Sequence, residues 1–339
     1  MSLIIDIGTK EVKAGLSTED TPSMRFSPYF YRQENTLKTT QFLNANHSTY
    51  DFESCMKNGE LNKNIFIQTI DEITNIYNSD SLIWIKSNDH PISFGPTAFE
   101  LFFEKYDIKK IYSAPSPVLV SLSYGQTNAM VLECGHTSCW ASIVFSGYLL
   151  ESSIEKNKTG GKYLSQQIND ELIQRGIELP LPKGIPDMKS SSFHDLIIDQ
   201  QLDRLKENEM INDFNVYNYC KDILFPKEYT EDNIGLQHLV LKSLMKCDYD
   251  VIMESSKKLV LAGGSSLFSG IGNEIVESIQ KYFPTLQTSL VQPESSDAQR
   301  YAAWKGGALI ANTDAMNDVW ITKEEYLENG IQYVIKKCG

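Results

Sequence analysis

The sequence of 339 residues lacks the hallmarks of three large classes of protein. Its longest apolar runs are only a few residues long, far short of the roughly 20 residues that a membrane-spanning helix needs. Its six cysteines include no C-x-x-C pair, so neither a zinc site nor a disulfide framework is predicted. Basic residues number 31 against 44 acidic ones, and the formal charge of -13 disfavours direct contact with nucleic acid.

The N-terminal residues give no sign of a targeting segment. Met1 is followed within two residues by the strand-like Leu3-Ile4-Ile5, so we expect neither a signal peptide nor a membrane anchor. Without a secretory signal, the cysteines are expected to be reduced thiols in a cytosolic or nuclear protein. The composition that remains is ordinary for a globular protein, with 41% hydrophobic and 22% charged residues. The length suits about two domains.

Short apolar segments alternate with amphipathic ones, which predicts an α/β fold. The expected strands are 3–7, 11–16, 81–85, 109–112, 129–133, 139–145, 258–261 and 287–291. The expected helices are 61–77, 96–105, 116–124, 160–175, 194–210, 236–245 and 270–282, with mixed helix and a tight glycine pair between 296 and 312. Residues 20–60 are polar and weakly periodic, and 178–193 are predicted as a loop.

Two of the expected strands end in the same motif. Asp6–Thr9 and Glu133–Thr137 each contain a carboxylate, a spacer, a glycine and a threonine. Two such turns facing one another would form paired anion-binding sites with carboxylates behind them. This arrangement suits a polyphosphate with a divalent cation held through water. Either turn alone is equally well explained as a common hairpin turn, but the pair favours a nucleotide.

A third glycine turn follows the expected strand at 258–261. Gly263 and Gly264 come directly after this apolar segment and precede a helix, so the backbone there is able to approach a flat or phosphorylated ligand closely. Three glycine turns at strand ends in one chain strengthen the prediction of a nucleotide site.

These residues resemble the actins and actin-related proteins. The most specific matches are Arg300–Ala311 and Trp320–Gly330, and weaker ones are Asp6–Gly15, Val131–Gly147, Gly160–Gly176 and Val260–Gly270. The resemblance implies the two-lobed α/β fold of actin, hexokinase and the 70-kDa heat-shock proteins, with duplicated core domains around a nucleotide cleft. Residues 1–123 plus 302–339 would form the first lobe. Residues 124–301, remodelled between 177 and 244, would form the second.

The family resemblance also implies ATP or ADP with Mg²⁺ in the cleft. Asp6 and Glu133 would hold the waters of the metal, with Glu133 standing where actin has aspartate. Actin has acidic residues where His136 and Lys221 stand, and for these two an ordinary structural role is favoured. The residues implied to line the nucleotide are Gly8, Thr9, Lys10, Lys13, Gly135, His136, Thr137, Gly263, Gly264, Leu267 and Arg300.

The departures from actin predict weak or absent catalysis. Actins arrange the attacking water with a glutamine and a histidine, and Ser116 and Trp140 occupy these positions. Serine is too short for this role, and an indole has one donor and no acceptor. Since such help is commonly worth about 10²–10⁴-fold in rate, we expect little or no ATP hydrolysis.

The regions that build actin filaments also differ. No DNase-binding loop is recognisable between residues 20 and 60, and only 23 residues separate Lys221 from Met245, where actin has a longer stretch with its inter-strand plug. Extra residues lie instead at 178–218, including an acidic helix. A filament needs complementary surfaces at both ends of each subunit, so we expect no self-polymerisation.

The resemblance therefore predicts a nucleotide-binding structural subunit of a larger cytoskeletal or other multiprotein assembly. The alternative is a slow ATPase that polymerises or switches with its nucleotide. Expected partners are the other subunits, including actin or another actin-related protein, with no direct contact to nucleic acid or membrane. The expected location is cytoplasmic and cytoskeleton-associated, with the nucleus as an alternative. An amphipathic helix of a partner would dock in a groove formed by Leu122, Gly125, Leu309, Ile310 and Met316.

Overall fold

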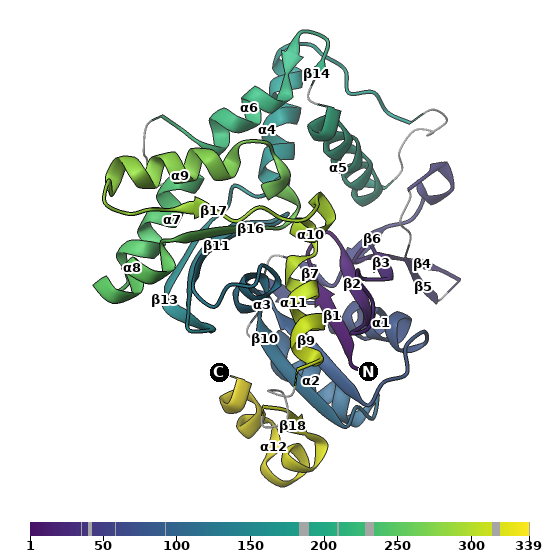
Figure 1. The fold of residues 1–339 in the computed structure, drawn as a ribbon. Coiled ribbons are helices and arrows are strands. Elements are labelled where there is room, and N and C mark those ends of the chain that lie inside the picture. The colour runs from purple at the N-terminus through teal and green to yellow at the C-terminus, as the bar shows by residue number, and fades with distance from the viewer. Residues whose placement is uncertain are drawn as a thin grey trace.

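Two β-sheets form the centres of two lobes in the computed structural model, which describes all residues except 35, 40–42, 58, 92, 183–189, 209, 228–233, 314–318 and 339. The first sheet has the order β18-β10-β9-β1-β2-β3, and the second has the order β13-β12-β11-β16-β17 (Figure 1). The first contains β1 (Leu3–Ile7), β2 (Val12–Leu16), β3 (Met24–Phe26), β9 (Ser81–Lys86), β10 (Lys110–Pro115) and β18 (Ile321–Thr322). The second contains β11 (Ala129–Cys134), β12 (Cys139–Phe145), β13 (Tyr148–Asn157), β16 (Lys258–Ala262) and β17 (Ser289–Leu290).

The two sheets repeat one topology. β1 pairs antiparallel with β2 and parallel with β9, as β11 pairs antiparallel with β12 and parallel with β16. Each sheet continues through one further antiparallel strand beyond the hairpin, β3 or β13, and one further parallel strand, β10 or β17. The central strands are continuous apolar segments because helices cover both faces of the parallel part. This repetition is the duplicated core that the two-lobed fold requires, whereas the lobe boundaries at 123/124 and 301/302 stay a prediction.

Helices surround both sheets, and most of the expected ones form with ends within about three residues of the prediction. In the first lobe they are α1 (Lys63–Thr74), α2 (Phe94–Glu104), α3 (Ser116–Ser123), α11 (Ala302–Ala311) and α12 (Lys323–Cys338). In the second they are α4 (Gly161–Gln174), α5 (Ser191–Asn208), α6 (Val216–Leu224), α7 (Leu236–Met245), α8 (Tyr249–Ser255), α9 (Ile271–Tyr282) and α10 (Ser296–Arg300). Among the described residues, no helix is both long and apolar enough to cross a bilayer.

One prediction about local structure is wrong, and one long strand was missed. The glycine pair Gly306-Gly307 lies inside α11 and is not a tight turn. A Cβ on Gly306 would overlap the carbonyl of Leu119 on α3, so glycine here allows two helices to pack closely. The strand β13 was not predicted, because at the edge of the sheet only a few of its residues are buried and the apolar alternation is weak.

The weakly periodic region 20–60 forms small strands at the tip of the first lobe. Its three-stranded sheet has the order β5-β4-β6, with β4 (Tyr29–Gln33), β5 (Thr36–Thr39) and β6 (Phe52–Ser54). A short 3-10 turn at Ala45–His47 and the hairpin β7 (Met56–Lys57)–β8 (Glu60–Leu61) complete it, and a similar hairpin, β14 (Met210–Ile211)–β15 (Phe214–Asn215), follows α5.

The helix α5 connects the two lobes across the top of the molecule. Figure 1 shows it between the helices α4 and α6 on one side and the strands β4 and β6 on the other. Phe193 at its start packs into an aromatic cluster with Phe52 and Tyr31, and Ser192 Oγ accepts a hydrogen bond from the Phe52 amide at 2.9 Å. The acidic segment expected as an insertion thus lies against the tip of the first lobe.

Candidate functional site

A cavity of about 780 Å³ separates the two lobes. This volume falls within the range of about 300–1,000 Å³ that is typical of small-molecule and cofactor sites. Its walls come from the carboxyl ends of β1, β9, β11 and β16, from the turns that follow these strands, and from α5 and α10. Every site residue expected from the sequence lines this cavity except Thr137, which lies at its edge and contacts Thr9.

The first turn joins β1 to β2, and this hairpin carries two lysines, Lys10 in the turn and Lys13 on β2. Lys13 lies opposite Asp6 in the strand register, and its Nζ is 2.6 Å from Asp6 Oδ2. Both side chains are largely buried, with exposed fractions of 14% and 13%. Burial alone would lower the pKa of Lys13, but the Asp6 charge outweighs it and raises the pKa, so the lysine stays charged at the cavity wall.

Lys10, which lies in the turn itself, reaches across the cleft to α5. It forms ion pairs with Asp199 and with Asp203, the latter at 2.7 Å. Lys206, one turn further along α5, bonds to Asp203 and to the Gly161 carbonyl at the start of α4. α5 is therefore fixed to the first turn on one side and to the second lobe on the other.

The second turn joins β11 to β12 and is packed tightly against its surroundings. The amide of Gly135 donates to the Ser138 carbonyl, and the amide of Gly161 donates to the Gly135 carbonyl. A Cβ on Gly160 would lie 2.5 Å from the Ser138 nitrogen, so this close approach requires glycine. His136 lines the cavity, and burial followed by the Lys10 charge lowers its pKa to about 4. It is therefore neutral at physiological pH and adds no positive charge.

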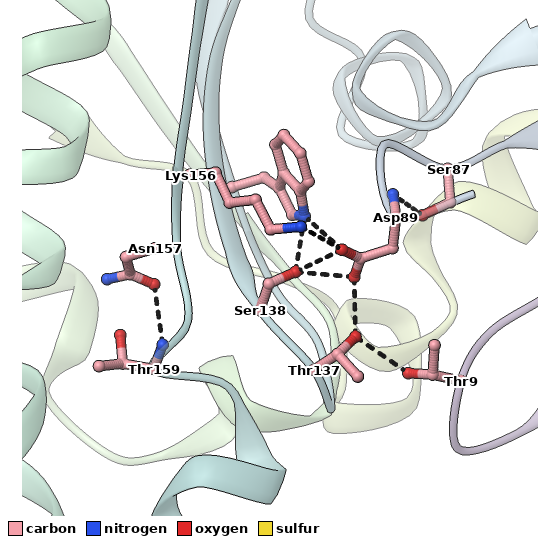
Figure 2. Close-up of polar contacts among 9 residues, drawn as sticks. Thr9, Ser87, Asp89, Thr137, Ser138, Lys156, Asn157 and Thr159 are labelled. Atoms are coloured by element: carbon pink, nitrogen blue, oxygen red, sulfur yellow. Dashed lines mark hydrogen bonds and ion pairs between the residues drawn. The ribbon is translucent and has the colours of Figure 1, made fainter. Parts of the chain in front are cut away.

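Asp89, which the sequence analysis missed, ties the first lobe to this second turn (Figure 2). It follows β9, and its Oδ2 accepts from Thr137 Oγ1 at 3.0 Å, while Ser138 Oγ lies 2.6 and 2.7 Å from its two oxygens. Trp140 Nε1 donates to Oδ1 at 3.1 Å, and Lys156 Nζ lies 3.1 Å from the same oxygen. Four donors of the second lobe thus converge on one carboxylate of the first.

The two residues at the expected water-orienting positions are both engaged in these contacts. Trp140 is held by Asp89 and lies under the Lys156 ammonium, 4.4 Å from the centroid of its ring. Ser116, at the first position of α3, donates to Glu133 Oε1. Burial is the main cause that raises the pKa of Glu133 to about 7, with further contributions from the charges of Asp6 and Asp89.

The third turn forms the wall of the cavity on the side of the second sheet. Gly263 has a φ of +87° and lies so close to the Cys134 carbonyl that a Cβ would overlap it, which explains glycine at this position. A Cβ on Gly264 would meet no atom within 4 Å. Leu267 and Arg300 complete this wall.

Several functional positions were missed by the sequence analysis. Lys206 and Glu207 of α5 line the cavity and were not foreseen, whereas Lys221 has the ordinary structural role that the sequence favoured, in an ion pair with Glu274. Asp89 had one usable signal, since it follows an apolar strand, and neighbouring parallel strands end at the same edge of a sheet. Lys156 had none, because its strand was not recognised.

Comparison with known proteins identifies the family. The family model described as Actin matches residues 1–215 and 194–339. The chain belongs to the actin family. Its curated relatives include actin-related protein 4 of Arabidopsis thaliana, which is 23% identical over 299 residues, covering 71% of this chain and 68% of the relative. The predicted membership of the actin family and the predicted two-lobed fold are thereby confirmed.

The residues around this actin-family cleft fit a nucleotide with a divalent cation. The three glycine turns bring backbone to the cavity surface, and Lys10, Lys13 and Arg300 supply positive charge beside it. In the described part of the chain no three His, Cys, Asp or Glu side chains converge as a direct metal site. A Mg²⁺ ion would therefore depend on phosphate oxygens and waters, which suits the position of Asp6 and Glu133.

The residues expected to form a groove for a partner helix differ in their exposure, and one of them lies outside the described residues. Leu309 is 54% exposed, whereas Leu122 and Ile310 pack against the clusters around α3 and α11. Gly125 follows the end of α3, and Met316 lies outside the described residues. A groove at this place stays a prediction.

Proposed function

We propose that this chain is an actin-related protein that holds ADP or ATP with Mg²⁺ as a clamp between its lobes, and that it serves as a structural subunit of a larger assembly. The observation that carries the proposal is the pair of equivalent turns, after β1 and β11, whose residues line the same 780 Å³ cavity from its two lobes. When bound, the nucleotide would supply phosphate oxygens to Mg²⁺ and contacts to both lobes.

The contacts of Ser116 and Trp140 support the absence of effective hydrolysis. The Ser116 hydroxyl donates its hydrogen bond to Glu133, and the single N–H of the Trp140 indole is shared between Asp89 and Ser138. Neither side chain then has a free proton to donate to an attacking water, and neither is a base that would take the proton of that water. The chain's own residues would bind and orient the phosphates and keep the lobes together, without a proton acceptor for water at the required positions.

A pair of glycine substitutions tests the nucleotide site. Gly264→Leu fills open space at the cavity wall, whereas Gly95→Leu fills open space near the start of α2, away from the cavity. A ligand at about 100 times its dissociation constant stabilises the folded state by about 2.7 kcal/mol, so Mg·ADP or Mg·ATP should raise the melting temperature by several degrees. The shift should persist in Gly95→Leu and disappear in Gly264→Leu. Identical melts of the unsubstituted protein with and without nucleotide contradict the proposal.

Phosphate release and pelleting distinguish the alternative of a slow, polymerising ATPase. The segment between α6 and α7 spans only residues 225–235, which supports the loss of the inter-strand contact of a filament. We expect no steady turnover and no pellet in Mg·ATP and salt. Long regular filaments with continuing phosphate release would favour the alternative, and purification of the tagged protein with its partners would identify the assembly.

A further inference from the structure

The first and second turns meet at the end of the cleft, through their threonines. Thr9 Oγ1 and Thr137 Oγ1 are 3.3 Å apart, and the proton of Thr137 is directed to Asp89, so Thr9 is the donor between the two hydroxyls. A phosphate oxygen that accepted from both would hold them roughly 4–5 Å apart, because each O–H···O bond adds about 2.7 Å. The space between the turns is thus closed by side chains of the protein.

Donors on the second turn and on the neighbouring strands β12 and β13 are already used in contacts with Asp89. Figure 2 shows the hydroxyls of Thr137 and Ser138 and the ammonium of Lys156 all directed at the carboxylate of Asp89. Trp140 Nε1 donates to the same carboxylate. Hydroxyl and ammonium groups are the kind of donors that bind phosphate oxygens. Here a carboxylate from the opposite lobe takes the place of an anionic ligand.

This end of the cleft also holds three carboxylates, two of which, Asp6 and Asp89, are paired with lysines. Burial would raise the pKa of Asp89, but hydrogen bonds from Ser138 and the charge of Lys156 outweigh it and hold the pKa below its usual value, so the carboxylate is ionised. The charges of Asp6 and Asp89 both act on Glu133, so the three carboxylates are close enough to interact. Two unit charges about 5 Å apart repel strongly in a partly buried site, by more than a tenfold change in binding.

We infer that Asp89 makes this cleft selective for a nucleoside diphosphate over a triphosphate. Its carboxylate occupies the donors of the second turn that a third phosphate would use, and it repels the added charge. The inference rests on the proposed function and deepens it, because it assigns the nucleotide state that the clamp holds and the residue that sets it.

Calorimetric titration of the full chain with AMP, ADP and ATP, each with Mg²⁺, tests this selectivity without a variant. Affinity should rise from AMP to ADP, and ADP should bind at least about tenfold more tightly than ATP. ATP binding as tightly as ADP overturns the inference and leaves the proposed function intact. Binding of none of the three overturns both.

Asp89→Asn then tests the residue itself, with Asp71→Asn as the matched control. Both substitutions remove one carboxylate charge that is paired with a lysine, but Asp71 lies on α1, bonded to Lys105. Asparagine keeps an acceptor for the donors of the second turn. Asp89→Asn should tighten ATP by about tenfold and change ADP by less than about threefold, and Asp71→Asn should change neither. An unchanged ratio of the ATP and ADP dissociation constants in Asp89→Asn overturns the inference. Equal weakening of the binding of both nucleotides, as expected if Asp89 held metal-bound water, overturns it as well.

Discussion

The two hairpins that face the cleft share a topology, and the comparison of interest is the cross-strand pair that contains the carboxylate of each. In the first lobe Asp6 lies opposite Lys13, and in the second Glu133 lies opposite Trp140. The first carboxylate is therefore paired with a buried ammonium, whereas the second is bonded to the Ser116 hydroxyl and has a pKa raised to about 7. The duplication sets where these side chains lie, but their surroundings differ: a lysine on the facing strand lies beside Asp6, whereas Glu133 is buried next to Ser116 of α3.

In the proposed function, this difference separates a hairpin that binds phosphate from a hairpin whose side chains hold the two lobes together. The first hairpin retains two lysines beside the cavity, as a phosphate site requires. In the second hairpin, Trp140 and the hydroxyls beside it contact Asp89 of the opposite lobe. These donors are thus engaged in contacts between the lobes. The predictions below change one hairpin at a time.

The largest effect is expected from Asp6→Ala, which leaves Lys13 buried without its partner. Breaking a buried ion pair on one side costs about 3–5 kcal/mol, because the remaining charge is uncompensated. We expect urea unfolding to show a loss of stability of this size. The double variant Asp6→Ala with Lys13→Met should recover most of it, since it removes both charges. A single variant that lost less than about 1 kcal/mol would show that Lys13 is solvated.

A somewhat smaller effect is expected from pH, through Glu133 in the second hairpin. Its pKa is raised from 4.5 to about 7, so the folded protein binds more protons than the unfolded chain between these values. Stability from this group is fully present below about pH 4.5 and is lost as the pH rises through about 7, with a total change on the order of 3 kcal/mol. Urea unfolding between pH 5 and 8 in a chelator measures it.

Glutamine substitutions provide the control for this pH dependence. Glu133→Gln should remove the contribution, because the amide stays neutral throughout. Glu254→Gln, at an exposed carboxylate paired with Lys257, should leave the slope of the unsubstituted protein in place. A slope that persists unchanged in Glu133→Gln would mean that another group causes it.

The sequence predicted the strand ends well and the contacts between lobes poorly, for a physical reason. Strands such as Leu3–Ile7 and Ala129–Cys134 are buried on both faces, so apolar runs reveal them, and the turns that follow carry glycines at fixed offsets. Asp89 and Lys156 are brought together only by tertiary packing, 67 residues apart. The one local signal for Asp89 is its position after an apolar strand, and Lys156 has none. Strand β13 stayed hidden because an edge strand tolerates polar residues on both faces.

The smallest effect is expected at the ion pairs that fix α5 to the first hairpin. Lys10 is 39% exposed and Asp203 is 32% exposed, so water and salt weaken their attraction. Surface pairs of this kind contribute about 0–1 kcal/mol, and Asp203 keeps Lys206 when Lys10 is lost. Lys10→Met should therefore lower the free energy of unfolding by no more than about 1 kcal/mol.

The dependence of stability on salt distinguishes the exposed Lys10 ion pairs from the buried contacts of the second hairpin. The Debye length falls from about 10 Å at 0.1 M salt to about 3 Å at 1 M, so the difference between Lys10→Met and the unsubstituted protein should shrink toward zero at 1 M. The difference caused by Asp89→Asn should persist, because Asp89 is only 17% exposed and its four donors lie within 3.1 Å. A Lys10→Met difference that is large and insensitive to salt would mean that α5 holds the lobes together as firmly as Asp89 does.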